Sequence, residues 1–536
     1  MTIQLAANLA DPGRHLDPYW NRCVGAGRAH EGLRANWQEH LGLVRQHGGM
    51  GMCRFHGLFH DDMFVLREVP KNLELGEAGI AGEYVYNFQY LDELFDRMLA
   101  AGVRPFVELG FCPEPLASVK KTCFWWGAHG SPPTDLAAWS ELVRRTVQHL
   151  VDRYGHGEVR QWYFEVWNEP NLPFFFAGTR TQYYELYAAS ALAVKSVDPL
   201  LRVGGPATSN FVCDHRYDGE REGDGAKALD VTADNIDELI WEPVWVANFL
   251  AWAGERGLPV DFVSCHPYPN EFGFFGPEGK RYARALSRNR HALRTDCLRL
   301  REVVRASAYP KAELHLTEWS SSPHCRDHSH DALPAAAYVI QAVIAASGLI
   351  DSLAYWTFTD VVEEHGPGRT AFHGGFGMIS FQGVVKPTFH AYRMLNHLGN
   401  TEIARCDGAI VTRDTAGRVS ALVWNYPSEA TPPMALSRAE ANSFTATGTA
   451  RAIDVRIHGL PAGARVLVEQ LDADHGDVVT EWERRGGPAE LSRELTEHLR
   501  AAAWATSTTE LQADASGTIH LKQTLPPWAV LAVRSL

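Results

Sequence analysis

Two glutamates that each close an apolar stretch beside tryptophan are the side chains in this sequence best placed for chemistry. Glu169 follows Asn168 directly after the mostly apolar and aromatic residues 161–167, and Pro170 ends the stretch. Glu318 closes a second apolar run, AELHLTEWS. A carboxylate at the end of a buried strand is costly to desolvate, so packing alone does not explain it. We therefore treat both glutamates as candidate catalytic groups.

A glycosidase typically needs two carboxyl groups at its active site. One carboxylic acid protonates the leaving oxygen, and the other carboxylate lies on the opposite face of the sugar. A separation of about 5–5.5 Å gives retention of configuration, and roughly 6.5–9.5 Å gives inversion. The alternative for either glutamate alone is a helix cap or one partner of a surface ion pair.

The strands that must position these residues recur along the chain and alternate with segments of helical periodicity. The apolar runs are residues 23–29, 50–59, 104–110, 161–167, 202–207, 260–268, 312–319 and 352–360. Between them, residues 136–150 show helical spacing after the start signal Pro133-Thr134-Asp135. This repeat predicts an α/β fold, a (β/α)8 TIM barrel, whose sites lie at the carboxyl ends of the strands. Glu169 and Glu318 would then face each other across the barrel mouth.

Two connections, residues 111–134 and 269–290, are longer than a bare barrel needs. Their aromatic residues are Phe124, Trp125, Trp126, Phe272, Phe274, Phe275 and Tyr282. Exposed rings can stack on sugar faces, and the alternative is that the rings pack on one another over the barrel mouth. The charged residues 217–227 are expected to form a solvated loop.

The pattern of the sequence changes after residue 399. From there on, apolar and polar residues alternate on a two-residue period in short runs, which are separated by turn residues. We expect three parts: an N-terminal segment, residues 1–20, that can pair with the accessory sheet; a catalytic barrel, residues 21–399; and an accessory β-sandwich, residues 400–536. No catalytic cluster is evident in the last part.

Composition excludes several classes of protein. The chain of 536 residues carries 64 acidic against 50 basic side chains and no basic block, which argues against a nucleic-acid partner. No run is long and apolar enough to span a membrane, and the first residues do not form a secretory signal, so we expect a cytoplasmic protein. Nine cysteines without CxxC spacing fit reduced thiols.

The segments WYFEVWNEPN and LHLTEWSSS resemble the two catalytic motifs of the retaining glycoside hydrolases built on (β/α)8 barrels. RFHGLFHDDM, VGGPAT, CHPYP, YWTFTDVVEEHG and FHGGFGMI resemble glycoside hydrolase family 39 in particular, which contains β-xylosidases and α-L-iduronidases. The resemblance extends from about residue 23 to about residue 398, and the later β-rich region is similar to the family's accessory sandwich.

The resemblance implies roles for individual residues. Glu169 would be the general acid/base and Glu318 the nucleophile. The implied substrate-binding residues are Asn168, His56, His266, Tyr268, Trp356 and Glu364. For His266 and Tyr268 the alternative is a polar strand end that lines the barrel, and for His56 it is a core histidine with satisfied hydrogen bonds. No metal and no cofactor is implied.

The predicted activity is that of a retaining, exo-acting β-1,4-xylosidase, similar to the bacterial β-xylosidases, that removes xylose from the non-reducing ends of xylo-oligosaccharides. The partner is a small carbohydrate, and the sequence leaves the oligomeric state open. An α-L-iduronidase would need a cation for the carboxylate of its substrate. Arg369 and Lys280 are candidates, but neither lies in a strand-end motif. An arabinosidase or another neutral exo-glycosidase is the next alternative.

A metal-dependent barrel hydrolase is the alternative from a different class. Metal-ligating residue types cluster after the seventh predicted strand: His324, Cys325, Asp327, His328, His330 and Asp331. Metal hydrolases on barrels usually take ligands from several strand ends, so a polar loop is the simpler interpretation. A sugar-binding protein without turnover is a third alternative, and the presence of both carboxylates disfavours it.

Overall fold

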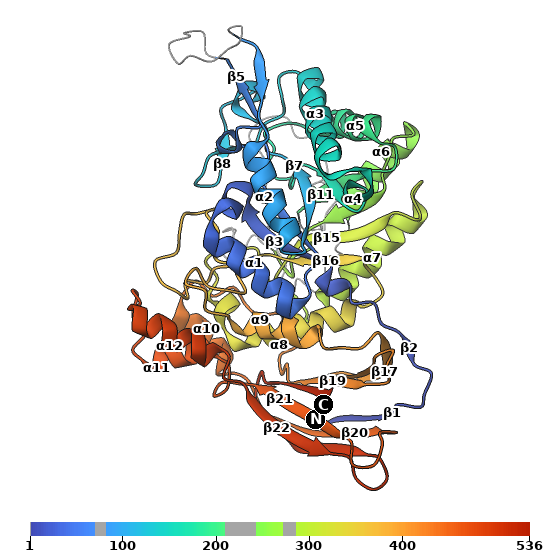
Figure 1. Ribbon diagram of the computed structural model, residues 1–536, viewed down its shortest axis with the longest axis vertical. Coiled ribbons are helices and arrows are strands. Elements are labelled where there is room, and N and C mark those ends of the chain that lie inside the picture. Colours follow the sequence, from blue (N-terminus) through green and yellow to red (C-terminus); the bar gives the residue numbers. More distant parts are fainter. Residues whose placement is uncertain (1, 70–81, 210–242, 272–285) are drawn as a thin grey trace, which may run out of the picture.

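The computed structural model describes residues 2–69, 82–209, 243–271 and 286–536 (Figure 1). Within them, eight parallel strands close into a barrel in the order β10-β11-β12-β15-β16-β3-β4-β7. Their bounds are β3 Cys23–Arg28, β4 Met52–His56, β7 Arg104–Leu109, β10 Tyr163–Val166, β11 Arg202–Thr208, β12 Phe262–Cys265, β15 Glu313–Trp319 and β16 Ser352–Tyr355. Each predicted run overlaps one of these strands, so the predicted (β/α)8 barrel is confirmed.

A helix follows each barrel strand and covers the outside of the barrel. These helices are α1 Ala35–Gly48, α2 Gln89–Ala100, α3 Leu136–Tyr154, α5 Arg180–Val197, α6 Val244–Glu255, α7 Ala292–Ala306, α8 Leu333–Ala346 and α9 Pro387–Leu395. The predicted start of α3 is confirmed, because the Asp135 carboxylate accepts the backbone N–H groups of Ala137 and Ala138 at 2.8 and 3.2 Å. This cap satisfies donors that the first helical turn would leave unpaired.

Short elements lie in the connections between these strands and helices. Within the described residues these include three two-stranded antiparallel sheets and one helical turn: β5 Leu66–Glu68 with β6 Tyr84–Tyr86, β8 Thr122–Cys123 with β9 Ala128–His129, β13 Asn270–Glu271 with β14 Leu286–Ser287, and α4 His156–Val159. The hairpin of β8 and β9 belongs to the long aromatic loop after β7.

The inside of the barrel changes from aromatic to charged along the strands. Phe106, Tyr163, Phe262 and His315 form one layer, with ring centroids 4.6–5.5 Å apart. Because inward positions alternate along a strand, the next inward residues lie two positions further on, towards the carboxyl ends. They include Glu108, Glu165 and Thr317, all buried. The charged half of the barrel therefore lies where a site is expected.

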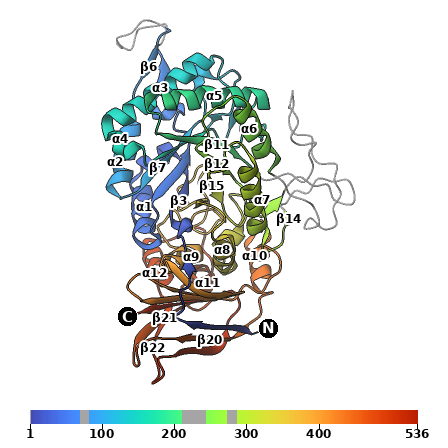
Figure 2. The ribbon, with the colours of Figure 1, turned by 90° about the vertical axis from the view of Figure 1, so that its right-hand side faces the viewer.

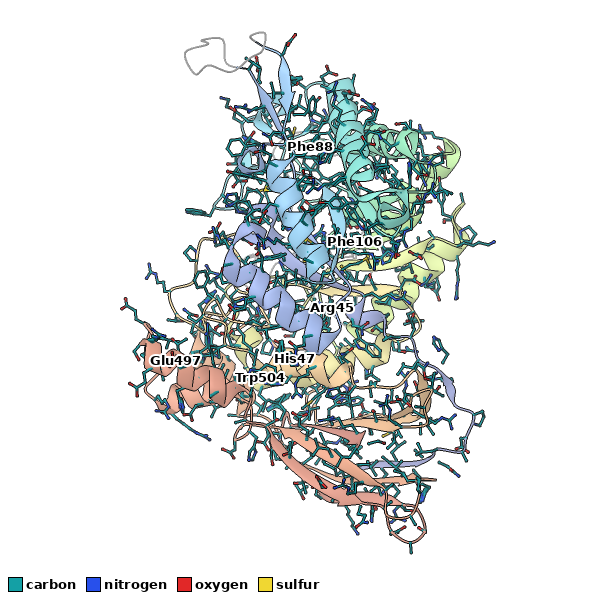
Figure 3. All side chains as sticks on the ribbon, in the orientation of Figure 1. Arg45, His47, Phe88, Phe106, Glu497 and Trp504 are labelled. Carbon is teal, nitrogen blue, oxygen red and sulfur yellow. The ribbon has the colours of Figure 1, made fainter. Side chains whose placement is uncertain are left out.

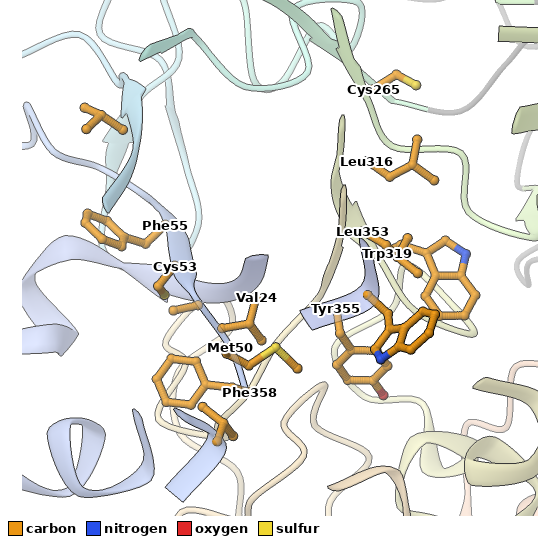
Figure 4. Packing of buried hydrophobic residues seen from close by; sticks show 14 of the residues in the cluster. Val24, Met50, Cys53, Phe55, Cys265, Leu316, Trp319, Leu353, Tyr355 and Phe358 are labelled. Atoms are coloured by element: carbon orange, nitrogen blue, oxygen red, sulfur yellow. The ribbon is translucent and has the colours of Figure 1, made fainter. Parts of the chain in front are cut away.

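An apolar cluster packs the barrel strands against their helices. Figure 4 shows part of this cluster, including Val24, Met50, Cys53, Phe55, Leu316, Leu353, Tyr355 and Phe358. Those of these residues that lie on strands, such as Cys53, Phe55 and Leu316, alternate with the inward ones, so these strands are buried on both faces.

Two further sheets enclose a second apolar core at one end of the molecule (Figures 1 and 2). Their orders are β1-β20-β23 and β2-β17-β18-β19-β24-β21-β22. The bounds are β1 Ile3–Asn8, β2 Arg14–His15, β17 Thr401–Cys406, β18 Ala409–Arg413, β19 Val419–Trp424, β20 Arg451–His458, β21 Arg465–Leu471, β22 Ser507–Gln512, β23 Ile519–Leu525 and β24 Val530–Ser535. The strand β1 pairs in parallel with β20, so the N-terminal segment belongs to this layer.

The late part of the chain also contains helices that the periodicity did not predict. They are α10 Arg438–Thr445, α11 Val478–Arg484 and α12 Arg493–Ala503. Each begins at a residue whose side chain accepts a backbone hydrogen bond, namely Ser437, Asp477 and Ser492. Between short strands such residues are equally typical of turns. The expectation of an accessory region made of strands alone was therefore incomplete.

Contacts between the two parts join α9 and α1 of the barrel to the late helices. The rings of His47 and Trp504 lie together, with centroids 4.9 Å apart (Figure 3). Arg438 of α10 pairs with Asp331, in the loop after β15, at 2.8 Å. The accessory region thus supports a loop at the catalytic end of the barrel. Within the described residues, every helix is too short or too polar to cross a membrane.

Candidate active site

Glu169 lies on the turn that follows β10. The φ angles of Trp167 and Glu169 are 73° and 45°, in the left-handed region that side-chain-bearing residues rarely adopt. Such strain costs on the order of 1–3 kcal/mol per residue and is concentrated at functional sites. The backbone N–H of Glu169 donates to the carbonyl of Ala207 at 2.8 Å, which holds the turn against β11. The side chain of Glu169 is buried.

Glu318 is the next-to-last residue of β15 and receives hydrogen bonds on both oxygens. Arg54 Nη1 donates to Oε1 at 2.5 Å, and the Tyr268 hydroxyl donates to Oε2 at 3.1 Å. His56 Nε2 lies 3.4 Å from Oε1. Charged donors favour the ionised form of a carboxylate, so this environment holds Glu318 as an anion.

His266 lies between the two glutamates. Its Nδ1 is 2.9 Å from Glu169 Oε1 and 3.8 Å from Glu318 Oε2. One donor or acceptor atom from each of the three side chains lies within 4.8 Å of the others. One oxygen of each carboxylate therefore lies within 4.8 Å of the other, which favours the short separation of retaining pairs over the roughly 6.5–9.5 Å of inverting pairs.

A chain of hydrogen bonds fixes the tautomer of His266. The Thr317 hydroxyl donates to Glu165 at 2.7 Å, so its oxygen is an acceptor for His266 Nε2 at 3.0 Å. The proton of the neutral ring is then on Nε2, and Nδ1 carries a lone pair. Because two acceptors cannot bond, the hydrogen bond between Nδ1 and Glu169 requires a proton on Glu169.

The pKa shifts of these groups agree with this assignment. Burial, and then the charge of Glu318, raise the pKa of Glu169 well above its ordinary value. Burial also raises the pKa of Glu318, but the charges of Arg54 and His56 oppose that rise. Burial lowers the pKa of His266 far below its usual range, so the ring is neutral. One shared proton therefore lies on Glu169, and the negative charge lies on Glu318.

Asn168 and Trp356 share contacts with Arg54. Asn168 Oδ1 accepts a hydrogen bond from Arg54 Nη2 at 2.9 Å. The Trp356 ring lies 5.8 Å from the Arg54 guanidinium carbon and 4.7 Å from the His56 ring. A Cβ atom at Gly25 would approach the Trp356 ring to 2.5 Å, so only glycine leaves room for this ring at the barrel mouth.

Glu364 follows β16 and is partly buried. Burial raises its pKa to about 7, and the charge of Glu318 contributes to that rise while His56 opposes it. His56 itself bonds to Glu108 at 2.7 Å, in addition to its approach to Glu318. It is therefore both a buried histidine with a satisfied partner and a neighbour of the second glutamate. The structure thus brings together all eight residues that the sequence selected.

Arg54, at the centre of this network, is not among the residues that the sequence singled out. It is fully buried in β4 and also contacts Glu165 and Glu108, each at 2.8 Å. A signal was present, because each of these charged residues interrupts a run that is otherwise apolar. A charge within a buried strand needs a partner, so the three residues point to one another once the barrel is known.

The aromatic loop after β7 packs in part on itself and is in part exposed. The Phe124 ring stacks on His56 and on Trp126, with centroids 5.6 and 5.4 Å away. These rings therefore pack on one another over the barrel mouth. Trp125 remains 67% exposed and is free to stack on a ligand. The second loop aromatics, Phe272, Phe274, Phe275 and Tyr282, and residues 217–227 lie outside the described residues.

The metal-type residues after β15 do not converge on one point. Asp327 caps a backbone N–H of Ser329, and His330 lies against carbonyl oxygens. Asp331 pairs with the buried Lys386 at 2.7 Å. Within the described chain, Cys325 is the one member of this cluster that belongs to a group of three converging His, Cys or carboxylate donors, and the other two donors come from the loop after β16.

Comparisons with known proteins agree with this geometry. The sequence model of the glycosyl hydrolases family 39 matches residues 1–520. A β-xylosidase of Geobacillus stearothermophilus is 34% identical over 507 residues, covering 94% of this chain and 89% of the relative. Two crystal structures superpose with a TM-score of 0.83: a GH39 enzyme from Xanthomonas axonopodis pv. citri, 32% identical, and a monomeric β-xylosidase from Caulobacter crescentus CB15, 30% identical. Both cover 100% of this chain, which covers 98% and 99% of theirs.

Proposed function

Because this chain belongs to glycoside hydrolase family 39, and is therefore a glycoside hydrolase, we propose that it is a retaining, exo-acting β-1,4-xylosidase. The observation that carries the proposal is the close pair of Glu169 and Glu318, of which one is held protonated and the other charged. The similarity to proteins named β-xylosidase supports xylose as the sugar.

The first step forms a glycosyl-enzyme. Glu318 attacks the anomeric carbon, while Glu169 donates its proton to the glycosidic oxygen and the bond to the leaving group breaks. Arg54 and Tyr268 hold Glu318 in one orientation, so little reorganisation is needed. The side-chain carbonyl oxygen of Asn168 accepts a hydrogen bond from Arg54. The side-chain N–H of Asn168 is then the group that donates to the sugar 2-hydroxyl.

The second step releases the sugar with its configuration retained. Glu169 is now an anion, and it deprotonates a water molecule that attacks the anomeric carbon and displaces Glu318. The pKa of Glu169 falls during the first step, because the charge of Glu318 is lost when the ester forms. His266 donates through Nε2 to Thr317 in both steps, which keeps its ring fixed beside Glu169.

The surroundings of the pair support a neutral sugar and exo action. Glu364 is a carboxyl group on the wall of the site, where the carboxylate of an iduronide would meet repulsion. Of the two cations considered for that role, Arg369 is exposed, and Lys280 lies outside the described residues. The Phe124 and Trp126 rings over the barrel mouth favour a pocket that accepts a chain end. An α-L-iduronidase or an arabinosidase is the outcome if a xyloside is refused.

We further propose that the enzyme acts in the cytoplasm. Eight of its nine cysteines lie in the described residues, and all eight are free thiols, as a reducing compartment would maintain.

A proton-NMR time course with an aryl β-xyloside tests the proposal. The wild type is expected to release β-xylose first, with the α-anomer appearing only by mutarotation. Initial release of α-xylose would contradict retention. If the xyloside is not hydrolysed, aryl α-L-iduronide and α-L-arabinoside are the next substrates, and activity that is lost on chelation would indicate a metal hydrolase.

Replacement of Glu169 by glutamine is expected to make the rate depend on the leaving group. General acid catalysis contributes about 10²–10⁴-fold, but only when the leaving oxygen needs a proton. The variant should therefore lose most of its kcat/KM on xylobiose and far less on a dinitrophenyl xyloside. An equal loss on both substrates would assign the acid to another residue.

The pH profile of kcat/KM should have an alkaline limb set by Glu169. Its raised pKa keeps the proton on Glu169 above the usual carboxyl range, and activity falls as pH rises through that pKa. In Glu169→Gln, assayed with the dinitrophenyl xyloside, this limb should vanish while the acidic limb, where Glu318 ionises, remains. Persistence of the alkaline limb would mean that a different group is the acid.

A further inference from the structure

Three different metal-type side chains meet on the wall of the site. Cys325 comes from the loop after β15, and Glu364 and His365 come from the loop after β16. Cys325 Sγ lies 3.0 Å from His365 Nδ1, and one donor atom of each residue lies within 4.8 Å of the other two. The mechanism above gives no role to Cys325 or His365.

The two loops are tied together on either side of this cluster. Arg326 donates to the carbonyl of Cys325 at 2.8 Å and to the carbonyl of Gly366 at 2.7 Å. The backbone N–H of Trp125 donates to the carbonyl of Glu364 at 2.7 Å. These bonds hold the main chain on both sides of the three side chains, whose donor atoms already lie within 4.8 Å of one another.

The donors are a thiol sulfur, an imidazole nitrogen and a carboxyl oxygen. Such a set suits zinc and its thiophilic relatives and does not suit magnesium or calcium, which take oxygen ligands. Three protein ligands leave a fourth, open position in a tetrahedral site. Cys325 is buried, but His365 is exposed, which gives an ion a path from solvent.

We propose that Cys325, Glu364 and His365 form a binding site for one thiophilic divalent cation, such as Zn²⁺ or Cd²⁺, and that its occupation inhibits hydrolysis. Binding displaces the thiol proton into solvent, and the thiolate, the imidazole Nδ1 and the Glu364 carboxylate coordinate the ion. The inhibition rests on the proposed function, because Glu364 is there a sugar-binding group. An ion on Glu364 withdraws that carboxylate from the sugar, so inhibition should be competitive with the xyloside.

Direct binding is measured by titrating the full chain with CdCl₂ and recording the thiolate-to-cadmium charge-transfer absorption in the ultraviolet. The wild type should bind one equivalent with this band. Cys325→Ser should lose the band, and His365→Gln should weaken the affinity by at least the roughly 10–100-fold that loss of a mere outer-shell partner of a metal ligand costs. Matched controls are Cys406→Ser, which removes a partly buried thiol elsewhere, and Cys213→Ser. Circular dichroism before each titration checks that the variants are folded.

The proposed ion site would be wrong if the band survived in Cys325→Ser. It would also be wrong if the band disappeared in Cys406→Ser or Cys213→Ser instead.

The inhibition is tested by adding Zn²⁺ to the xyloside assay. The apparent KM should rise with Zn²⁺, recover with a chelator and rise less in His365→Gln, whose metal-free activity should equal that of the wild type. If the ion binds without any change in KM, the proposed inhibition is wrong, while the proposed ion site stands. An inactive wild type with an intact cadmium band would count against the xylosidase proposal alone.

Discussion

Replacing Glu318 by alanine is expected to lower kcat/KM for an aryl β-xyloside by on the order of 10⁴-fold or more, because the covalent route then has no nucleophile. The protein should remain folded. Glu318 is one of several carboxylates around Arg54, and its removal leaves Glu108 and Glu165 as partners for that cation. Initial-rate kinetics and a thermal unfolding curve measure both quantities.

Two further measurements separate loss of the nucleophile from general damage. Sodium azide should restore activity to Glu318→Ala by entering the space of the missing carboxylate, and the product should be the α-xylosyl azide, since attack comes from the face that Glu318 occupied. Glu313→Ala is the matched control on the same strand, at the opposite end of the barrel, where Glu313 pairs with Arg202. That variant should keep its activity. A β-configured azide, or full activity in Glu318→Ala, would exclude Glu318 as the nucleophile.

The second large effect is expected at Arg54. The substitution Arg54→Met leaves the buried carboxylates Glu108 and Glu165 without their cation, and breaking a buried ion pair typically costs about 3–5 kcal/mol. Because single domains are stable by only about 5–15 kcal/mol, the free energy of unfolding should fall by a large fraction. Urea unfolding followed by tryptophan fluorescence measures this loss.

Arg54 should also affect the chemistry through Glu318. Its charge favours the anion of Glu318, so its removal raises the pKa of that carboxyl group. The acidic limb of the pH profile of kcat/KM should therefore move to higher pH in Arg54→Met, assayed under conditions in which the variant is folded. A merely structural role for Arg54 would lower the amount of active enzyme without moving that limb.

Two variants control for the charge and for the substitution itself. Arg54→Lys keeps the charge but loses the fork that reaches Glu165, Glu318 and Asn168 together, so it should recover part of the stability and little of the activity. Arg104→Met removes a partly exposed arginine that pairs with Glu158, and it should change stability by less than about 1 kcal/mol. Equal effects of Arg54→Met and Arg104→Met would contradict the central role of Arg54.

The site itself is a source of instability in this protein. Glu169 has a strained backbone, and its raised pKa means that its ionisation opposes folding as pH rises above the ordinary carboxyl range. The folded state gains from the protonated form at low pH and loses this gain as pH passes through the raised pKa. Glu169→Gln, which stays neutral, should therefore unfold at a higher urea concentration than the wild type at neutral and alkaline pH.

The sequence by itself determined the barrel and its two central glutamates. The eight strands were predictable because strands buried on both faces must be continuous apolar runs, and the helices between them have their own period. Glu169 and Glu318 stood out because each ends such a run, where a carboxylate has no packing role. The candidate substrate-binding residues came from resemblance to a family, since no periodicity marks His56 or Glu364.

The tertiary structure alone decided which charges meet and which side chain holds the proton. Arg54, Glu108 and Glu165 lie on three strands far apart in sequence, and only closure of the barrel brings them together. The same holds for the neutral His266 beside Glu169, whose tautomer depends on Thr317 and Glu165. Protonation depends on distances of a few ångströms in a buried environment, and sequence spacing does not contain those distances.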